Sequence, residues 1–117
     1  MTNEIIFKIA PRDLWAQAEQ TGSFTGAPVD IADGYIHFST ATQVRETAAK
    51  HFAGQQNLLL ISVNAAALGA ALKFEVSRGG ALFLHLYSKL PLAAVLKVEA
   101  LPLGDDGRHI FPELEDQ

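Results

Sequence analysis

The order of apolar and polar positions near the N-terminus predicts a strand followed by a helix. Residues 5–9 form a short β-rich run that ends at Pro11. Pro11 then opens a helix with Asp13 in its first turn, and Gly22 ends that helix. Because two glycines and a proline follow, and an Asp-Gly turn dipeptide comes after them, we expect residues 22–34 to form a loop.

A second helix is predicted between two further strands. Residues 35–38 form a short strand, and apolar positions at helical spacing continue over residues 41–52. Thr40 and Gln43 fit a capping box before that helix. Residues 57–63 are apolar without alternation, which is typical of a buried central strand.

The rest of the chain favours strands joined by turns. Asn64 caps a short alanine-rich turn or helix, and strands are expected at residues 72–76, 81–87 and 94–101. Helices early and strands late predict a single α+β domain over residues 1–117, with two main helices and a small mixed or antiparallel split sheet. No long crossover helices separate the later strands, which argues against a doubly wound parallel fold.

Composition limits the classes of function. The 117 residues are 49% hydrophobic and 19% charged, as in ordinary globular domains. The chain has no cysteine, which excludes a disulfide scaffold, a thiol nucleophile and Cys-ligated metal sites. Its net charge of −4 argues against broad nucleic-acid binding, although a small phosphate site is compatible with it. No secretory pattern or membrane-spanning stretch is visible, so we expect a cytoplasmic protein without membrane contact.

The sequence DGYIHFST at residues 33–40 is the most informative chemical segment. It places His37 in a short strand, with Ser39 and Thr40 at the expected start of a helix. Such a junction points backbone N–H groups outward and binds anions readily. His37 and Ser39 are two positions apart, so we expect them on one side of the strand. The alternative is structural: the two hydroxyls only cap the helix, and His37 is a hydrogen-bonded core residue.

A second polar group lies in the sequence FEVSRGGALFLHLY at residues 74–87. Glu75 and Arg78 precede two glycines, which permit a tight turn and a close approach of the backbone to a ligand. We expect Arg78 to be the main anion contact, because its guanidinium can bind a phosphate in bidentate fashion. His85 and Tyr87 share one strand face. The alternative is a surface ion pair between Glu75 and Arg78 and a rim position for Tyr87.

Polar side chains inside apolar strands need hydrogen-bond partners when they are buried. We therefore expect His37 and His85 to line one concave site, although 48 positions separate them (85 − 37). His51 fits a structural or exposed position on a helix, and His109 fits a solvated loop.

A metal site and a serine hydrolase site have weaker support. The possible metal ligands are Asp33, His37, Glu75 and His85, but no local spacing such as His-x-x-x-His supports them. We expect no bound metal. The chain also lacks the Gly-x-Ser-x-Gly pattern of a nucleophile elbow, so a Ser-His-Asp hydrolase has little support.

Taken together, these segments resemble the small family called domain of unknown function 952. The segments that carry the resemblance are residues 33–40, 43–52, 74–80 and 82–87. A Trp-bearing helix after the first strand and a late Phe-Pro pair fit the same family, so the resemblance covers nearly the whole chain. Leu84 stands where a Pro is common in the family, and Ser88 where a Gly is common, so the loop there is expected to be less bent.

By fold, this family is similar to the ADP-ribosyltransferase superfamily, whose members hold NAD in a cleft of a split mixed sheet. The resemblance implies that His37 grips a ribose, with Ser39 or Thr40 beside it. It also implies that Tyr87 or His85 packs on the nicotinamide.

In that superfamily a late Glu orients the reacting ribose. Glu75 and Glu99 are both candidates for this role here, and we favour Glu75. A carboxylate placed in this way stabilises the positive charge that builds on the sugar as the N-glycosidic bond breaks.

Three functional hypotheses remain open. The first is a cleft that binds NAD or a related nucleotide, with transfer or cleavage at the nicotinamide ribose and with His37 and Glu75 as catalytic residues. Its ligand-binding residues are Ser39, Thr40, Arg78, His85 and Tyr87. The second is a non-catalytic module that binds a nucleotide or another phosphorylated small molecule. The third is a metal-dependent hydrolase built on His37, His85 and Glu75. The sequence leaves the acceptor substrate and the oligomeric state open.

Overall fold

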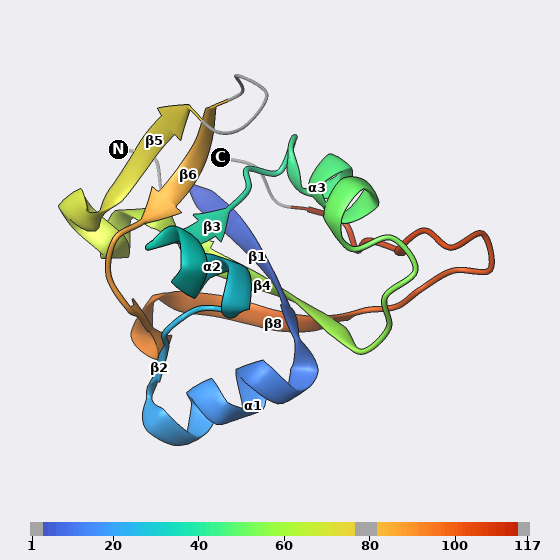
Figure 1. Cartoon of the computed structure of the whole chain (residues 1–117), viewed down its shortest axis with the longest axis horizontal. Coiled ribbons are helices and arrows are strands. Elements are labelled where there is room, and N and C mark those ends of the chain that lie inside the picture. Colours follow the sequence, from blue (N-terminus) through green and yellow to red (C-terminus); the bar gives the residue numbers. More distant parts are fainter. Residues whose placement is uncertain (1–3, 77–81, 115–117) are drawn as a thin grey trace.

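The computed structural model describes residues 4–76 and 82–114 of the chain (Figure 1). The helices are α1 (Arg12–Thr21), α2 (Pro28–Asp33) and α3 (Val44–His51), with the 3₁₀ segments η1 (Ala65–Ala71) and η2 (Leu92–Ala94). The strands are β1 (Ile5–Pro11), β2 (Ser23–Phe24), β3 (Ile36–Phe38), β4 (Leu58–Asn64), β5 (Leu72–Val76), β6 (Leu82–Leu86), β7 (Leu90–Pro91) and β8 (Val95–Leu101). The small α+β domain predicted from the sequence is confirmed.

The strands form three small sheets with the orders β1-β4-β8, β2-β7 and β3-β6-β5. All pairings among the described strands are antiparallel, so the antiparallel alternative is correct for this part of the chain and the mixed sheet is not. β4 is the middle strand of its sheet, and its side chains from Leu58 to Val63 are all buried. The prediction of a central buried strand is therefore confirmed.

One apolar core joins the three sheets. It contains Ile61 from β4, Phe24 from β2 and Leu86 from β6, together with Trp15 from α1. A second apolar cluster lies between β1, β4 and α3, where Val44 is fully buried. Since β1 contributes to both clusters, its residues 6–10 are buried on both faces.

The segment expected to be a loop at residues 22–34 contains the short helix α2 as well as strand β2. Pro28 occupies the first helical position, where its missing N–H costs nothing. Gly34 ends the helix in the left-handed conformation, with φ +88°. The prediction of a loop is wrong here because Pro28 begins a helix and does not break the chain.

Helix α3 begins at Val44, three residues later than predicted. Residues 41–43 form a turn, in which the Gln43 side-chain oxygen accepts a hydrogen bond from the Thr40 backbone N–H at 3.1 Å. This is one half of the expected capping box. The Gln43 amide also donates to the Leu82 carbonyl at 2.7 Å, which ties the start of α3 to strand β6.

The sheet β3-β6-β5 has one apolar and one polar face. Ile36, Phe38, Leu84 and Leu86 face the core, and the residues between them in sequence point the other way. Two backbone hydrogen bonds between Ser39 and Phe7, of 2.8 and 2.9 Å, connect the end of β3 to β1. Figure 1 shows β5 and β6 as a hairpin that extends from the body of the molecule, with α2 in front of β3.

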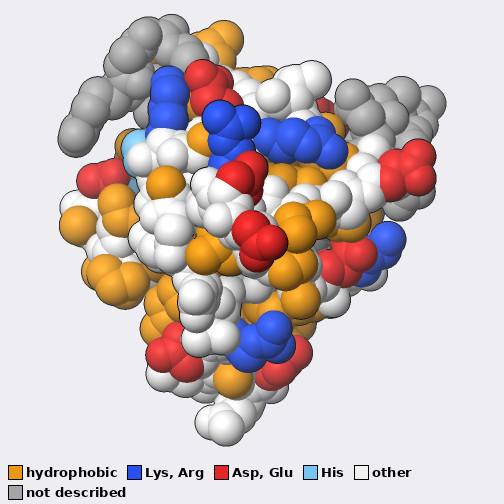
Figure 2. All heavy atoms as spheres, turned by 90° about the vertical axis from the view of Figure 1, so that its right-hand side faces the viewer, with side chains coloured by type: hydrophobic (Ala, Val, Ile, Leu, Met, Phe, Trp, Pro, Cys, Tyr) orange, Lys and Arg blue, Asp and Glu red, His pale blue; other side chains and the backbone are white. Residues whose placement is uncertain are grey.

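The outer surface carries charges of both signs. On the face that Figure 2 shows, Lys and Arg side chains lie among Asp and Glu side chains rather than forming a wide basic surface. In the part of the chain that the structure describes, no helix has the length and apolar character needed to cross a membrane.

Candidate functional site

Four rings gather on the polar face of the sheet β3-β6-β5, and we call Tyr35, His37, His85 and Tyr87 the ring cluster. His37 lies directly opposite His85 in the strand register, and their ring centroids are 5.8 Å apart. Tyr35 stacks on His85 with centroids 4.0 Å apart, and its ring is 5.3 Å from that of Tyr87. Each tyrosine lies one residue outside the strand that carries a histidine, Tyr35 before β3 and Tyr87 after β6, and the spacing of two positions puts it on the same face as that histidine.

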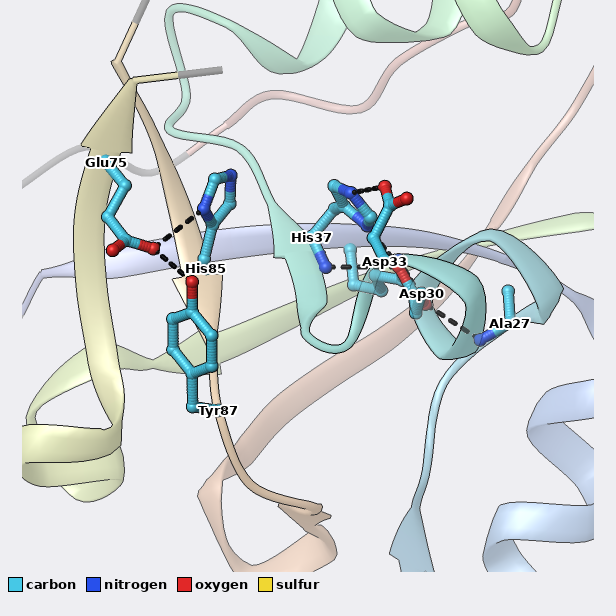
Figure 3. A network of polar contacts seen from close by, with 8 residues as sticks. Ala27, Asp30, Asp33, His37, Glu75, His85 and Tyr87 are labelled. Atoms are coloured by element: carbon cyan, nitrogen blue, oxygen red, sulfur yellow. Dashed lines mark hydrogen bonds and ion pairs between the residues drawn. The ribbon is translucent and has the colours of Figure 1, made fainter. Parts of the chain in front are cut away.

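Glu75 of β5 connects two members of the ring cluster (Figure 3). Its Oε1 atom accepts a hydrogen bond from the Tyr87 hydroxyl at 2.5 Å and another from His85 Nδ1 at 3.1 Å. The hydrogen bond from Tyr87 and that from His85 lower the pKa of Glu75. The same bond to Glu75 raises the pKa of Tyr87 to about 12. At neutral pH the carboxylate is therefore ionised and the phenol keeps its proton.

His85 is almost fully buried, at 2% exposure, beneath the other rings. Because an ionised carboxylate only accepts hydrogen bonds, Nδ1 of His85 carries the proton that it shares with Glu75. Its Nε2 atom is buried and has no hydrogen-bond partner among the described residues. Within the ring cluster, this atom is the polar group that is buried and yet lacks a hydrogen-bond partner in the described part of the chain.

Two carboxylates from α2 hold the ring of His37 at both nitrogens. Nδ1 lies 2.5 Å from Asp30 Oδ1, and Nε2 lies 2.9 Å from Asp33 Oδ2 (Figure 3). The backbone N–H of His37 also donates to Asp30 Oδ1 at 3.1 Å. The carboxylate of Asp30 thus fixes both the main chain and the ring of His37, as an orienting carboxylate does for a histidine in many sites.

Asp30 is itself bound to a buried lysine. Nζ of Lys8, on the core strand β1, lies 2.9 Å from Asp30 Oδ2, and the backbone N–H of Ala27 donates to the same oxygen at 2.7 Å. Burial works against the ionised form of Asp30, but the hydrogen bond with His37 and the charge of Lys8 outweigh it. They lower the pKa of Asp30 to about 2. Burial also lowers the pKa of Lys8, although Asp30 opposes that shift.

A surface pocket of about 210 Å³ lies next to the ring cluster. Its lining includes Tyr35, Tyr87, Asp30, Ser88 and Lys89. The Tyr87 side chain is 46% exposed, so a ligand in this pocket could stack on its ring. Lys89 is the cation that this pocket offers to a negatively charged ligand.

The structure brings together four of the predicted site residues, namely His37, Glu75, His85 and Tyr87. Ser39 lies elsewhere: it is buried, and its hydroxyl is 3.0 Å from that of Thr47 on α3. The carbonyl of Thr40 accepts the backbone N–H of Val44, at the beginning of α3. For these two residues the geometry favours the structural interpretation, because their hydrogen bonds hold helix α3.

The other predicted residues do not join the ring cluster. Arg78 lies outside the described residues, so the expected anion contact stays a prediction. Glu99 lies on β8 and lines a separate small pocket with Ser62. His51 is exposed at the end of α3, and His109 Nε2 lies 2.8 Å from the Gln55 carbonyl.

Three residues of the site were missed by sequence reasoning: Lys8, Asp30 and Tyr35. Tyr35 is two positions before His37, as Tyr87 is two positions after His85, and this repeated spacing was a usable signal. Lys8 stands alone in an apolar strand, and a buried lysine needs an acidic partner. No pattern in the sequence shows that this partner is Asp30, 22 residues away.

The described residues offer no set of three His, Asp or Glu side chains placed to hold one metal ion. Both ring nitrogens of His37 already contact carboxylates, and Nδ1 of His85 contacts Glu75. This arrangement gives the metal-dependent hydrolase hypothesis no support.

Comparison with known families matches residues 9–98 to the family described as protein of unknown function (DUF952). The chain belongs to this family. The resemblance noted from the two histidine segments is therefore confirmed at the level of the family. No curated protein matches the chain.

Solved structures of the protein CC0527 from Caulobacter crescentus are similar to this chain. The crystal structure has 48% sequence identity and a TM-score of 0.86, and the alignment covers 91% of this chain and 93% of that one. The solution NMR structure of CC0527 has 49% identity and a TM-score of 0.81, with coverages of 89% and 90%. The α+β fold described here is thus shared with an experimentally determined relative.

Proposed function

We propose that the ring cluster and its adjacent pocket bind NAD or a related nucleotide. The observation that carries the proposal is that Glu75 hydrogen-bonds two members of the ring cluster to which His37 also belongs. Of the two glutamates considered for the ribose, Glu75 is the one beside these rings, whereas Glu99 lies on another sheet. A carboxylate, two histidines and two tyrosines on one surface suit a ligand with both rings and hydroxyls.

The chemistry of each group fits one part of such a ligand. Tyr87 and Tyr35 present aromatic faces on which a nicotinamide or adenine ring can stack. Lys89 lies at the pocket, where its ammonium group can contact a phosphate. The Asp33 side chain is 40% exposed and offers a carboxylate for ribose hydroxyls, and the ring of His37 holds it in position.

The reaction we propose is cleavage of the nicotinamide–ribose bond. Nicotinamide leaves with the electron pair of the N-glycosidic bond, and positive charge develops on the ribose. Water, or the hydroxyl of an acceptor, then forms a new bond to the ribose carbon and releases a proton to solvent. The lowered pKa of Glu75 keeps it ionised, so its carboxylate can accept a hydrogen bond from a ribose hydroxyl and stabilise the charge.

Binding is tested first, by calorimetric titration with NAD, ADP-ribose and nicotinamide mononucleotide. We expect saturable binding that Tyr87→Ala and His37→Ala weaken about tenfold or more, whereas the matched control His51→Ala, an exposed histidine on α3, leaves it unchanged. A nucleotide at 100 times its dissociation constant should add about 2.7 kcal/mol to the free energy of unfolding. Absence of binding by all three nucleotides at millimolar concentration would contradict the proposal.

Catalysis is tested separately, by measuring release of nicotinamide from NAD. We expect slow release that Glu75→Gln abolishes and that Glu99→Gln, the matched control on β8, does not affect. The substitution to Gln keeps the size of the side chain and removes its charge.

A binding module without catalysis is the second candidate. It is favoured by the fact that Glu75 Oε1 already accepts two hydrogen bonds, from Tyr87 and His85. Nucleotide binding with no nicotinamide release by the wild-type protein would select this candidate over the enzyme.

A further inference from the structure

The outer edge of β5 has no partner strand among the described residues, because β5 is the last strand in the order β3-β6-β5. The Tyr87 N–H donates to the Ala71 carbonyl at 2.8 Å, which marks residues 71 and 87 as a hydrogen-bonded pair at the start of the hairpin. Hydrogen-bonded pairs alternate with non-hydrogen-bonded pairs along an antiparallel ladder. Lys73 and Glu75, two and four positions after residue 71, therefore also belong to hydrogen-bonded pairs and direct their backbone groups toward β6. The N–H and C=O groups of Leu72, Phe74 and Val76 therefore point outward.

Apolar side chains accompany these outward backbone groups. Phe74 is 52% exposed, Val76 69% and Leu82, opposite Val76 in the hairpin, 50%. Leu72, Phe74 and Val76 alternate with Lys73 and Glu75, so the apolar side chains lie on one face of the strand and the charges on the other. A regular strand edge with an exposed apolar row is a template for pairing with another strand.

The order Leu-Lys-Phe-Glu-Val in β5 is complementary to itself when reversed. In an antiparallel pair of two such strands centred on Phe74, Lys73 of each copy lies opposite Glu75 of the other. Leu72 then lies opposite Val76, and the two Phe74 side chains meet at the twofold axis. Opposite charges and apolar side chains in these positions stabilise cross-strand pairs.

We propose that two copies of this chain associate through β5, in antiparallel register about Phe74, to form one continuous six-stranded sheet. The contact is isologous, since the same edge serves both copies. The outward groups of Leu72, Phe74 and Val76 form about six backbone hydrogen bonds with their counterparts. Lys73 and Glu75 occupy non-hydrogen-bonded pairs, in which side chains approach more closely.

This arrangement also affects the candidate site, although it does not depend on the proposed nucleotide binding. Glu75 is the carboxylate that contacts Tyr87 and His85. Association places Lys73 of the second copy across from Glu75, on the same face of the sheet as the ring cluster. The dimer therefore has two ring clusters on one face, each next to a charge from the other copy.

Strand β8 is the competing edge, because Lys97 and Glu99 flank Val98 in the same order. β8 carries a register irregularity between Ser62 and Val63 of its partner β4, next to the exposed Leu96. Bulges of this kind disturb an edge for further pairing. The pairing of β5 with β6 is regular over its whole length, and for that reason we assign the contact to β5.

Sedimentation velocity over about 10 µM to 1 mM tests the association. One five-residue edge is small beside the roughly 1,200–2,000 Å² of a stable interface, so we expect a concentration-dependent dimer. The mass should rise from 12.6 kDa toward twice that value. A protein that stays monomeric at about 1 mM overturns the proposal.

Two pairs of variants locate the contact. Phe74→Asp should raise the dissociation constant about tenfold or more, whereas Leu96→Asp, which makes the same change at an exposed position on β8, should not. Lys73→Glu should weaken association by placing like charges opposite each other, whereas Lys97→Glu should have no effect. Loss of the dimer in the β8 variants but not in the β5 variants overturns the assignment.

A disulfide tests the register, since the chain has no native cysteine. In a hydrogen-bonded pair the two Cα atoms at position 74 lie about 5.5 Å apart, within the range of about 4.4–6.8 Å that a disulfide bridges. Phe74→Cys should therefore form a covalent dimer on mild oxidation much faster than Leu96→Cys. Equal rates for the two variants contradict the register.

Discussion

The most unusual residue of the site is a lysine in the core. Lys8 lies on a strand that is buried on both faces, and its ammonium group contacts Asp30, which in turn holds His37. An isolated charge in such a place is very costly, but a paired and hydrogen-bonded one is tolerated. The position of His37 thus depends on an ion pair that belongs to the core.

Acid should destabilise the protein through Asp30. Its pKa is lowered from an ordinary value of 3.8 to about 2, so the stability that its ionised form provides is present above about pH 4. That stability, of about 2 kcal/mol, is lost as the pH falls through about 2. Urea unfolding between pH 5 and pH 2, at roughly unit steps, measures it.

The control for this prediction is Asp13, an exposed carboxylate in the first turn of α1. Asp13→Asn should keep the acid dependence of the wild type, whereas Asp30→Asn should reduce it. The carboxyl chemical shift of Asp30 in the wild-type protein reports the same midpoint without a substitution. A midpoint near the ordinary value would contradict the ion pair.

Tyr87 should lose its phenolic proton at a higher pH than an ordinary tyrosine. Its pKa of about 12 arises from the hydrogen bond to Glu75, so the phenol stays protonated well above pH 10. Tyr35→Phe leaves Tyr87 as the last tyrosine of the chain, and tyrosinate absorbance then follows it alone. Adding Glu75→Gln should bring the midpoint down toward 10.0, the ordinary value.

Residue types and spacing predicted part of the site. His37 and His85 were expected to share a surface because each lies in an apolar strand, and the strand register places them opposite each other. Asp30 could not be found in this way, since its role depends on α2 folding back onto β1 and β3. Ser39 was expected beside His37, but its backbone pairs with Phe7 and its hydroxyl packs against α3.

At the scale of elements, helix α2 is what carries two carboxylates to His37. It is only six residues long, and isolated helices of that length are not stable in water. Its contacts with the rest of the chain, above all those of Asp30, stabilise it. This explains why the sequence around Pro28 indicated a loop: the local signals are weak, and the ion pair that fixes the helix is non-local.

Gly26 should be the position before α2 that tolerates substitution least. Its φ is +119°, and a Cβ atom there would come within 2.8 Å of the Asp30 Cβ atom. Gly22, which ends α1, also has a positive φ of +93° but has open space around it. Gly26→Ala should therefore cost about 2–4 kcal/mol, and Gly22→Ala about 1 kcal/mol.

Thermal or urea unfolding of the two variants checks this difference. The Nδ1 signal of His37 in NMR spectra should move in Gly26→Ala, because Asp30 is displaced, and stay in place in Gly22→Ala. Equal destabilisation by the two substitutions would show that the contact with Asp30 is unimportant.

The strands were easier to predict than the helices. Apolar runs predicted both ends of β4, β5, β6 and β8 to within about two residues, since burial favours apolar side chains along the whole strand. The two-residue strands β2 and β7 have no such run and were missed. Helix α3 was predicted to begin three residues too early and to end one residue too late, because the apolar spacing extends into the turn that precedes it.

At the scale of the whole molecule, the three sheets share one core. Ile61, Phe24 and Leu86 come from different sheets and belong to the same buried cluster. Local periodicity does not determine the order in which strands pair or which face of each sheet turns inward. Pattern reasoning alone therefore predicted only the class of the fold, whereas the family resemblance covers nearly the whole chain.

A shared core predicts a single cooperative unfolding transition. Trp15 of α1 is the sole tryptophan, and it packs on Phe24 with ring centroids 5.4 Å apart. Its fluorescence reports the region of the β2-β7 sheet, whereas far-ultraviolet circular dichroism averages over all elements. The two transitions should coincide in urea. Separate midpoints would mean that the sheets unfold independently.

The contact between Lys8 and Asp30 also has a consequence for how this sequence can change over time. Losing either partner alone leaves one charge buried among apolar side chains, which typically costs about 3–5 kcal/mol. Exchanging both for apolar residues of similar volume can be nearly neutral for folding, but it would release His37 from its orienting carboxylate. The two positions should therefore vary together among relatives, and chains that have lost the pair should also differ at the position of His37.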